Sequence, residues 1–331
     1  MRILFNSLRV LVCLVLSLFV LYWFGAIYFD GPLGQASVGN LILGIAWLVL
    51  IVVIWLVPMD RRLKWGGFAA AICLVAIPWL IICPSNDRDW KPEFGETGWA
   101  EVEGDKVTFH NYRHFAYVDG EEIPKWESRT FHLSNLKGAD LFFDAFGGDL
   151  LAHPIISFDF GDEGNVCLSV ETRREVHESF SALGGLYKMF ELQYIFGEES
   201  DFIGVRTRVR NEPVYLYRFR TSRERVEETL MESIQTQNEL KDKPRFYNVL
   251  TSNCTTSLRA QTPSEMRAKF DWRMLVNGYL DQYLFEKGAI ETAGLSFVEL
   301  RPRVLINEAA NRADDPSKFS TLVRRGRPGF Q

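Results

Sequence analysis

The chain has 331 residues, a formal net charge of −5 and 47% hydrophobic residues, so it is long enough for a large core and mildly acidic. This balance argues against a nucleic-acid partner, because proteins that bind nucleic acid gather Lys and Arg into basic patches. The averages combine two unlike parts: residues 1–84 are almost entirely apolar, whereas residues 85–331 have the composition of a soluble domain.

Three apolar runs fill the first part, at residues 10–28, 38–57 and 66–83. Each approaches the roughly 20 residues that a helix needs to cross a bilayer, and Pro78 in the third is tolerated there as a kink. The first run alone resembles a signal peptide, but two more spans follow closely. Residues 1–84 are therefore expected to be a retained anchor of three transmembrane helices.

Basic residues predict the orientation of this anchor. Arg2 and Arg9 flank the first span, and Arg61, Arg62 and Lys64 lie between the second and third, whereas the loop between the first and second has no Lys or Arg. Because Lys and Arg are enriched on the cytoplasmic side, the N-terminus is expected in the cytoplasm. In a bacterium this predicts a multi-pass protein of the inner membrane with a periplasmic C-terminal domain.

The remaining chain predicts an α+β domain over residues 101–310, after a polar linker at 85–100 and before a loose tail at 311–331. Period-two alternation predicts strands and helical spacing of apolar residues predicts helices. The predicted strands are 107–118, 129–133, 155–160, 166–171, 190–196, 202–209 and 214–219. The predicted helices are 222–240, a short one from 254, and 271–287. This order predicts a mainly antiparallel sheet followed by packing helices.

A candidate nucleophile lies in the stretch YNVLTSNCTTSLR, residues 247–259. Ser252 and Asn253 are good N-cap residues, so a short helix can begin at Cys254. A thiol at a helix N-terminus meets the positive end of the helix dipole and unpaired N–H groups, which favour the reactive thiolate. The same N–H groups, with Asn253 and Thr255 beside them, can stabilise an oxyanion.

Two other interpretations of Cys254 stay open. It can be buried and inert, since free cysteine is among the most buried residue types. It can also pair with Cys167, the other cysteine of the outer domain, in an oxidising compartment. Tyr247 opens the same stretch and is a candidate for contact with the substrate. The sequence contains no CxxC spacing and its outer domain has only two cysteines, so neither a metal site nor a cofactor is expected.

A hairpin is predicted from two alternating segments, residues 153–160 (HPIISFDF) and 165–171 (NVCLSVE). Most of their polar side chains occupy odd-numbered positions, and a period of two puts these on one face. The turn GDEG at residues 161–164 favours residue 159 opposite 165, which pairs odd positions with odd ones. This register places residue 153 opposite residue 171.

His153 and Glu171 are therefore expected to be a general base and the carboxylate that orients it. Side chains directly opposite one another have Cβ atoms about 5 Å apart. A carboxylate there accepts from one ring nitrogen and leaves the other for the thiol of Cys254. The alternative for His153 is a strand-end histidine that is hydrogen-bonded to backbone.

Six stretches in chain order carry a family resemblance. They are NYRHFAY (111–117), AHPIISFDF (152–160), VETRRE (170–175), FELQYIFGEESDFIGVRTRVR (190–210), VYLYRF (214–219) and FYNVLTSNCTTSLR (246–259). Together they resemble the periplasmic domain of the Lnb-type lipoprotein N-acyltransferase family. The resemblance implies a permuted NlpC/P60-like (papain-like) cysteine fold, a Cys254–His153 pair, and acyl transfer to the N-terminal amine of lipoproteins.

The expected activity is thus transfer of an acyl chain from a membrane phospholipid or diacylated lipoprotein, through a thioester, to an amine. Arg173 and Arg174 are candidates for contact with a lipid phosphate, since arginine binds phosphate in a bidentate manner. The stretch 183–196 reads either as a lipid-facing lip or as a core strand with its lead-in turn. Two other functions stay open: a cell-wall peptide amidase or endopeptidase, and a non-catalytic membrane module.

Overall fold

The computed structural model describes residues 2–118, 121–148, 150–252, 271, 273, 277–313 and 315–330. These residues divide into two compact units, which are treated separately below. The membrane unit comprises residues 1–85, 177–191 and 246–248, and the sheet unit comprises residues 86–176, 192–245 and 249–331.

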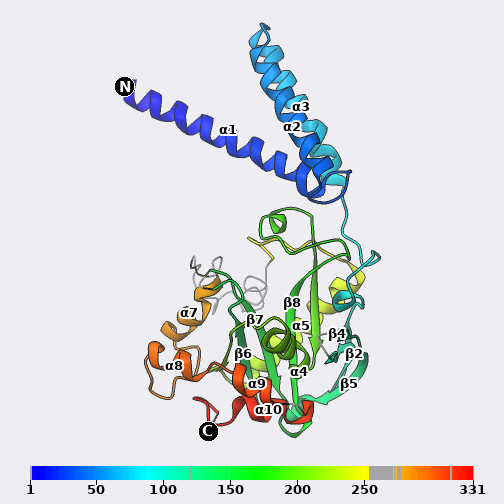
Figure 1. The fold of residues 1–331 in the computed structure, drawn as a ribbon, viewed down its shortest axis with the longest axis vertical. Helices are drawn as coiled ribbons and strands as arrows, with labels where there is room; N and C mark the ends of the chain where they lie inside the picture. Colours follow the sequence, from blue (N-terminus) through cyan, green and yellow to red (C-terminus); the bar gives the residue numbers. More distant parts are fainter. Residues whose placement is uncertain are drawn as a thin grey trace. The chain divides into compact units, whose positions relative to one another are not determined.

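The membrane unit is built on three helices, α1 (Arg2–Asp30), α2 (Val38–Leu56) and α3 (Arg61–Ile81) (Figure 1). All three are long and apolar enough to cross a bilayer. Most of their side chains are exposed, and the small buried cluster between them includes Trp47 and Ala71. Exposed apolar side chains on such helices suit contact with lipid chains, so the structure agrees with the three predicted spans.

A later segment, residues 177–191, belongs to the same unit as these helices. The ring of Tyr187 stacks on Tyr22 and Phe29 of α1, with centroids 5.2 and 5.1 Å apart. The Lys188 Nζ donates hydrogen bonds to the carbonyls of Trp79 and Ile82, both at 2.8 Å. The first part of the predicted lip therefore packs against the apolar helices, and the sheet strand begins only at residue 191.

The sheet unit contains an eight-stranded sheet in the order β1-β2-β9-β8-β7-β6-β10, with β5 also paired to β2. Its strands are β1 (Trp99–Glu103), β2 (Lys106–Arg113), β5 (Trp126–His132), β6 (Gly138–Asp144), β7 (His153–Asp159), β8 (Asn165–Arg173), β9 (Glu191–Gly197) and β10 (Val214–Arg218). A separate two-stranded ribbon joins β3 (Ala116–Val118) to β4 (Glu121–Ile123). The β2–β9 pair is parallel, whereas β1–β2, β2–β5, β6–β7, β7–β8 and β6–β10 are antiparallel, so the sheet is mixed.

Helices cover both faces of this sheet at β6. They are α4 (Glu199–Gly204), α5 (Arg223–Asp242), α7 (Leu280–Glu286), α8 (Phe297–Arg303), α9 (Asn307–Arg312) and α10 (Pro316–Arg324) (Figure 1). Phe142 joins a buried cluster with Phe202 and Phe319, while its neighbour Phe143 joins another with Leu300. Because neighbouring strand residues point to opposite faces, both faces of β6 are buried. The α+β class predicted from the sequence is confirmed.

The predicted strand at residues 202–209 is wrong. The segment is helical, as α4 followed by a π-helical turn at Val205–Val209. Its β-branched residues favour a strand locally, but the buried Asp201 accepts hydrogen bonds from Arg113 and from the Phe115 amide. Tertiary contacts of this kind override a weak local preference. The predicted helix 271–287 is also shorter in the described residues, where α7 ends before Gly288 with its φ of 65°.

The structure also differs from the prediction of a loose tail at residues 311–331. Helix α10 lies in this segment, and Phe319 and Val323 are fully buried in the core. Arg324, on the last turn of α10, forms ion pairs with the buried Asp140 of β6 and Glu199 of α4. Pro, Gly and Arg content indicated disorder, yet the apolar residues of this helix complete the core over β6.

We expect Phe319→Ala to lower the free energy of unfolding by about 3–5 kcal/mol, because the substitution opens a cavity in a packed core. Chemical denaturation of the full chain in detergent, followed by tryptophan fluorescence, measures the change. Lys318→Ala is the matched control on the same helix; the Lys318 side chain is 72% exposed, and its loss is expected to stay within about 0.5 kcal/mol. A loss below about 1 kcal/mol for Phe319→Ala contradicts a structural role for α10.

Candidate active site

The hairpin of β7 and β8 has the register that alternation predicts. Residue 155 pairs with 169, 157 with 167, and 159 with 165. The connecting turn contains Gly161 and Gly164, with φ of 62° and 99°. Glycine is the residue that adopts such angles without steric cost, so the turn fixes the register. The predicted pairing is therefore confirmed, and it brings His153 and Glu171 together.

His153 contacts Glu171 chiefly through a third residue, Ser169. The His153 Nε2 lies 2.7 Å from the Ser169 Oγ and 3.3 Å from the Glu171 Oε1. The Ser169 hydroxyl donates to the same carboxylate oxygen at 2.6 Å. Since its single proton is directed to Glu171, the Ser169 oxygen accepts from His153, which assigns the ring proton to Nε2. The lone pair of a neutral His153 then lies on Nδ1.

Glu171 is held in its charged form. Burial alone raises the pKa of this carboxyl, but the positive charge and hydrogen bond of His153, together with Arg206 and Ser169, hold the pKa of Glu171 well below its usual range. The Arg206 Nη2 lies 3.3 Å from the Glu171 Oε1. A carboxylate that stays ionised at neutral pH can stabilise an imidazolium as it forms.

Arg206 joins this carboxylate to a second one. Its Nε donates to the Asp144 Oδ2 at 3.0 Å, and its Nη1 donates to the carbonyl of Phe202 at 2.7 Å. Asp144 ends β6 and is the register partner of His153. The guanidinium, with its side chain only 5% exposed, therefore connects α4, β6 and β8.

The side chain of Asn277 forms a clamp on Ala152, the residue that precedes His153. The Asn277 side chain accepts from the Ala152 amide at 2.9 Å and donates to the Ala152 carbonyl at 2.5 Å. An amide side chain that bonds both the N–H and the C=O of one residue restrains the backbone conformation at that residue. The start of β7, and with it the Cα of His153, is thereby held from both sides.

Sequence reasoning named His153 and Glu171 but missed Ser169, Arg206 and Asp144. Ser169 was visible on the polar face of the hairpin, two residues before Glu171. Arg206 was hidden by the wrong strand prediction, because only a helix at this position directs it to Glu171. Asp144 ends a strand that the prediction did not include.

The predicted nucleophile, Cys254, lies outside the described residues, as do its neighbours Asn253 and Thr255. Tyr247 belongs to the membrane unit, where its amide donates to the Phe190 carbonyl at 2.9 Å. Cys167 is a free, buried cysteine on β8, and burial raises the pKa of its thiol well above the usual range. A free thiol at this position does not fit the disulfide with Cys254 that the sequence left open.

The two arginines that were candidates for contact with a lipid phosphate contact the linker at residues 85–100 instead. Arg173 is buried, donates to the carbonyls of Phe94 and Gly95, and lies over the Trp90 ring at 4.3 Å. Arg174 lies 3.6 Å from a carboxylate oxygen of Glu93. We therefore leave both out of the candidate site. Among the described residues, no group of three or more His, Cys, Asp or Glu is placed to hold a metal ion.

Comparison with known proteins adds one match. Residues 122–278 match the family model described as the Lnb N-terminal periplasmic domain, a range that spans His153, Glu171 and position 254. This confirms the resemblance stated from the sequence. Neither the search of curated proteins nor that of solved structures finds a match. The permuted papain-like arrangement therefore stays a prediction.

We expect Arg206→Met to lower the free energy of unfolding by about 3–5 kcal/mol at pH 7, because it leaves two buried carboxylates without their cation. The folded-state pKa of Glu171 is depressed from 4.5. Its stabilising contribution is therefore present above this value and is lost as the pH falls through the folded-state pKa. The difference between Arg206→Met and the unchanged protein should accordingly shrink below about pH 4.5.

Chemical denaturation at pH 7 and pH 4 measures this difference. Arg210→Met is the matched control, since Arg210 lies one turn later and is exposed. Its effect should stay within about 0.5 kcal/mol at both pH values. A loss for Arg206→Met that is equally large at pH 4 contradicts the electrostatic account.

Proposed function

We propose that this Lnb-type membrane protein is a cysteine acyltransferase that moves an acyl chain from a membrane phospholipid or a diacylated lipoprotein to an amine, through a thioester on Cys254. The acceptor is the N-terminal amine of a lipoprotein. The single observation that carries the proposal is the chain of contacts His153–Ser169–Glu171–Arg206, which orients an imidazole inside the matched domain.

The first half-reaction forms the thioester. The Nδ1 of His153 takes the thiol proton of Cys254, and the thiolate adds to an ester carbonyl of the donor lipid. Backbone N–H groups at the predicted helix start, together with Asn253, stabilise the resulting oxyanion. The C–O bond of the ester then breaks, and the alcohol leaves with the proton that His153 carried.

The second half-reaction uses the same groups in reverse. The acceptor amine adds to the thioester carbonyl and gives a proton to His153. The C–S bond breaks, an amide forms, and the proton returns to the sulfur of Cys254. Two substrates thus use one nucleophile in turn, and the bonds and protons of the two steps balance without a metal or cofactor.

Ser169 and Glu171 have a positioning role in this scheme. The Nε2–H bond to Ser169 selects the tautomer with its lone pair on Nδ1. Glu171, whose pKa His153, Arg206 and Ser169 hold well below its usual range, stabilises the imidazolium that both half-reactions form. The three candidate spans support lipid as the substrate class, because they keep the chain at the bilayer where acyl chains reside.

The other chemistry compatible with a Cys–His pair is hydrolysis of a cell-wall peptide. The membrane helices favour a lipid substrate, although an enzyme that acts on the wall can also be tethered. The non-catalytic module loses its main support, because the Cys167 that its disulfide requires is a free cysteine.

We expect His153→Ala to reduce acyl transfer by about 10²–10⁴-fold, since general-base catalysis contributes that much. Glu171→Gln and Ser169→Ala should each reduce it by at least about 10-fold, because they disturb the tautomer and the charge of the imidazole. The measurement is the rate at which an acyl adduct forms on Cys254, read by mass spectrometry of the intact protein in native membranes.

The pair His132–Glu163 supplies the matched control. Its Nδ1 and Oε1 atoms lie 2.6 Å apart, closer than the 3.3 Å of the candidate pair, but its histidine side chain is 39% exposed. His132→Ala and Glu163→Gln should leave the rate of adduct formation unchanged. An unchanged rate in Glu171→Gln removes that residue from the mechanism.

We expect Cys254→Ala to leave lipoprotein N-termini without the added acyl chain in cells that rely on this protein. Mass spectrometry of lipoprotein N-terminal peptides, with and without the variant, checks this outcome. Unchanged N-acylation together with altered cell-wall peptide fragments would identify the protein as an amidase instead.

A further inference from the structure

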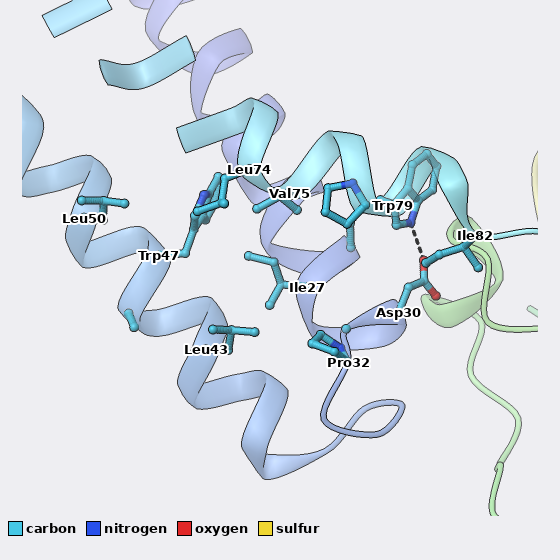
Figure 2. Close-up of a pocket in the computed structure, with 14 residues that line it drawn as sticks. Ile27, Asp30, Pro32, Leu43, Trp47, Leu50, Leu74, Val75, Trp79 and Ile82 are labelled. Atoms are coloured by element: carbon cyan, nitrogen blue, oxygen red, sulfur yellow. Dashed lines mark hydrogen bonds between the residues drawn. The ribbon is translucent and has the colours of Figure 1, made fainter. Parts of the chain in front are cut away.

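A cavity of about 590 Å³ lies among the three helices of the membrane unit. Ile27 of α1, Trp47 of α2 and Leu74 of α3 all line it, and Figure 2 shows side chains from the three helices around one space. Its volume falls in the range of ligand pockets, well above that of an ordinary packing void. The cavity is therefore large enough to be a binding site.

The walls of the cavity are apolar, with one ionisable exception. Asp30, the last residue of α1, lines one end, where its Oδ2 accepts from the Trp79 Nε1 at 2.5 Å and from the Lys188 amide at 3.0 Å (Figure 2). The Asp30 Oδ1 is buried and has no hydrogen-bond partner among the described residues. Buried polar atoms of folded proteins are normally paired, so a donor from a ligand would complete this carboxylate.

Aromatic residues indicate the depth at which this carboxylate lies. Trp79 contacts Tyr22 and Trp23, with ring centroids 6.1 and 5.7 Å apart, in the same part of the unit as Asp30. Toward the opposite ends of α2 and α3, Trp55 and Trp65 contact each other at 5.1 Å. Trp and Tyr are enriched at the two membrane–water interfaces. The Asp30 end of the cavity is therefore at headgroup level, and its apolar part extends toward the acyl chains.

We propose that this cavity binds one acyl chain of a membrane lipid whose ammonium headgroup donates to Asp30, with phosphatidylethanolamine as the lipid. The apolar walls suit an acyl chain, because lipid acyl chains are the apolar groups that surround the helices at that depth of a bilayer. The carboxylate matches the ammonium in both charge and hydrogen bonding. Lys188 does not replace this donor, since its Nζ donates to the carbonyls of Trp79 and Ile82.

This site goes beyond the proposed function and does not depend on acyl transfer. Its test uses binding alone, so that Cys254→Ala should bind the lipid as well as the unchanged protein does. In the unchanged protein, lipid binding without any acyl transfer would refute the proposed function and leave this site standing. Loss of binding with transfer retained would do the reverse.

The experiment uses the full chain in nanodiscs containing phosphatidylethanolamine with a photoreactive group on one acyl chain. Mass spectrometry of the peptides after irradiation should locate saturable labelling on the cavity-lining parts of α2 and α3. Unlabelled phosphatidylethanolamine should compete, whereas phosphatidylcholine, which has no headgroup donor, and phosphatidylglycerol, which is anionic, should compete poorly.

Three variants sharpen the test. Ala46→Phe places a ring in the cavity and should lower the labelling by about tenfold, while Ala70→Phe adds the same ring at an exposed position of α3 outside the lining and should change nothing. Asp30→Asn removes the charge and should abolish the preference for phosphatidylethanolamine over phosphatidylcholine. Labelling that is spread over all lipid-facing residues, or that Ala46→Phe does not reduce, would overturn the proposal.

Discussion

One guanidinium holds the candidate site together. Arg206 reaches Glu171 on β8 and Asp144 on β6, and the imidazole of His153 lies on the strand between them. Both carboxylates are largely buried, so each depends on the guanidinium as a partner for its charge. His153 and this cation together hold the pKa of Glu171 well below its usual range, Ser169 donates to the carboxylate, and the tautomer of His153 follows. The chemistry proposed for the site therefore depends on a residue that acts through Glu171 and Asp144.

Much of this site could be predicted from the alternation of polar and apolar residues alone. Odd and even positions of the hairpin differ in polarity, and two glycines fix its turn, so the pairing of His153 with Glu171 required no tertiary information. Arg206 could not be found in this way, because its β-branched neighbours resemble a strand. Its helix exists because Asp201 is buried against Arg113 and because α9 and α10 pack over α4. Contacts between residues far apart in sequence decided that element.

The membrane unit shows the same limit of local reasoning. Hydropathy locates three spans because any bilayer helix must be long and apolar. It does not indicate that residues 177–191 join them, since that depends on Tyr187 stacking on α1 and on Lys188 donating to the end of α3. An anchor that is separate in sequence is thus assembled with part of the later chain, and Asp30 acquires one of its two donors, the Lys188 amide, only through that assembly.

Asn277 and helix α10 have a practical consequence for the choice of where a shorter fragment of the protein can end. The family match ends at residue 278, yet the sheet face that carries Phe142 and Ile155 is covered by residues as late as Val323. A fragment cut at the matched boundary would keep the clamp on Ala152 but expose Phe142 and Ile155 to water. Such a truncated polypeptide would be prone to aggregation, so recombinant versions of the soluble portion need to continue through residue 330.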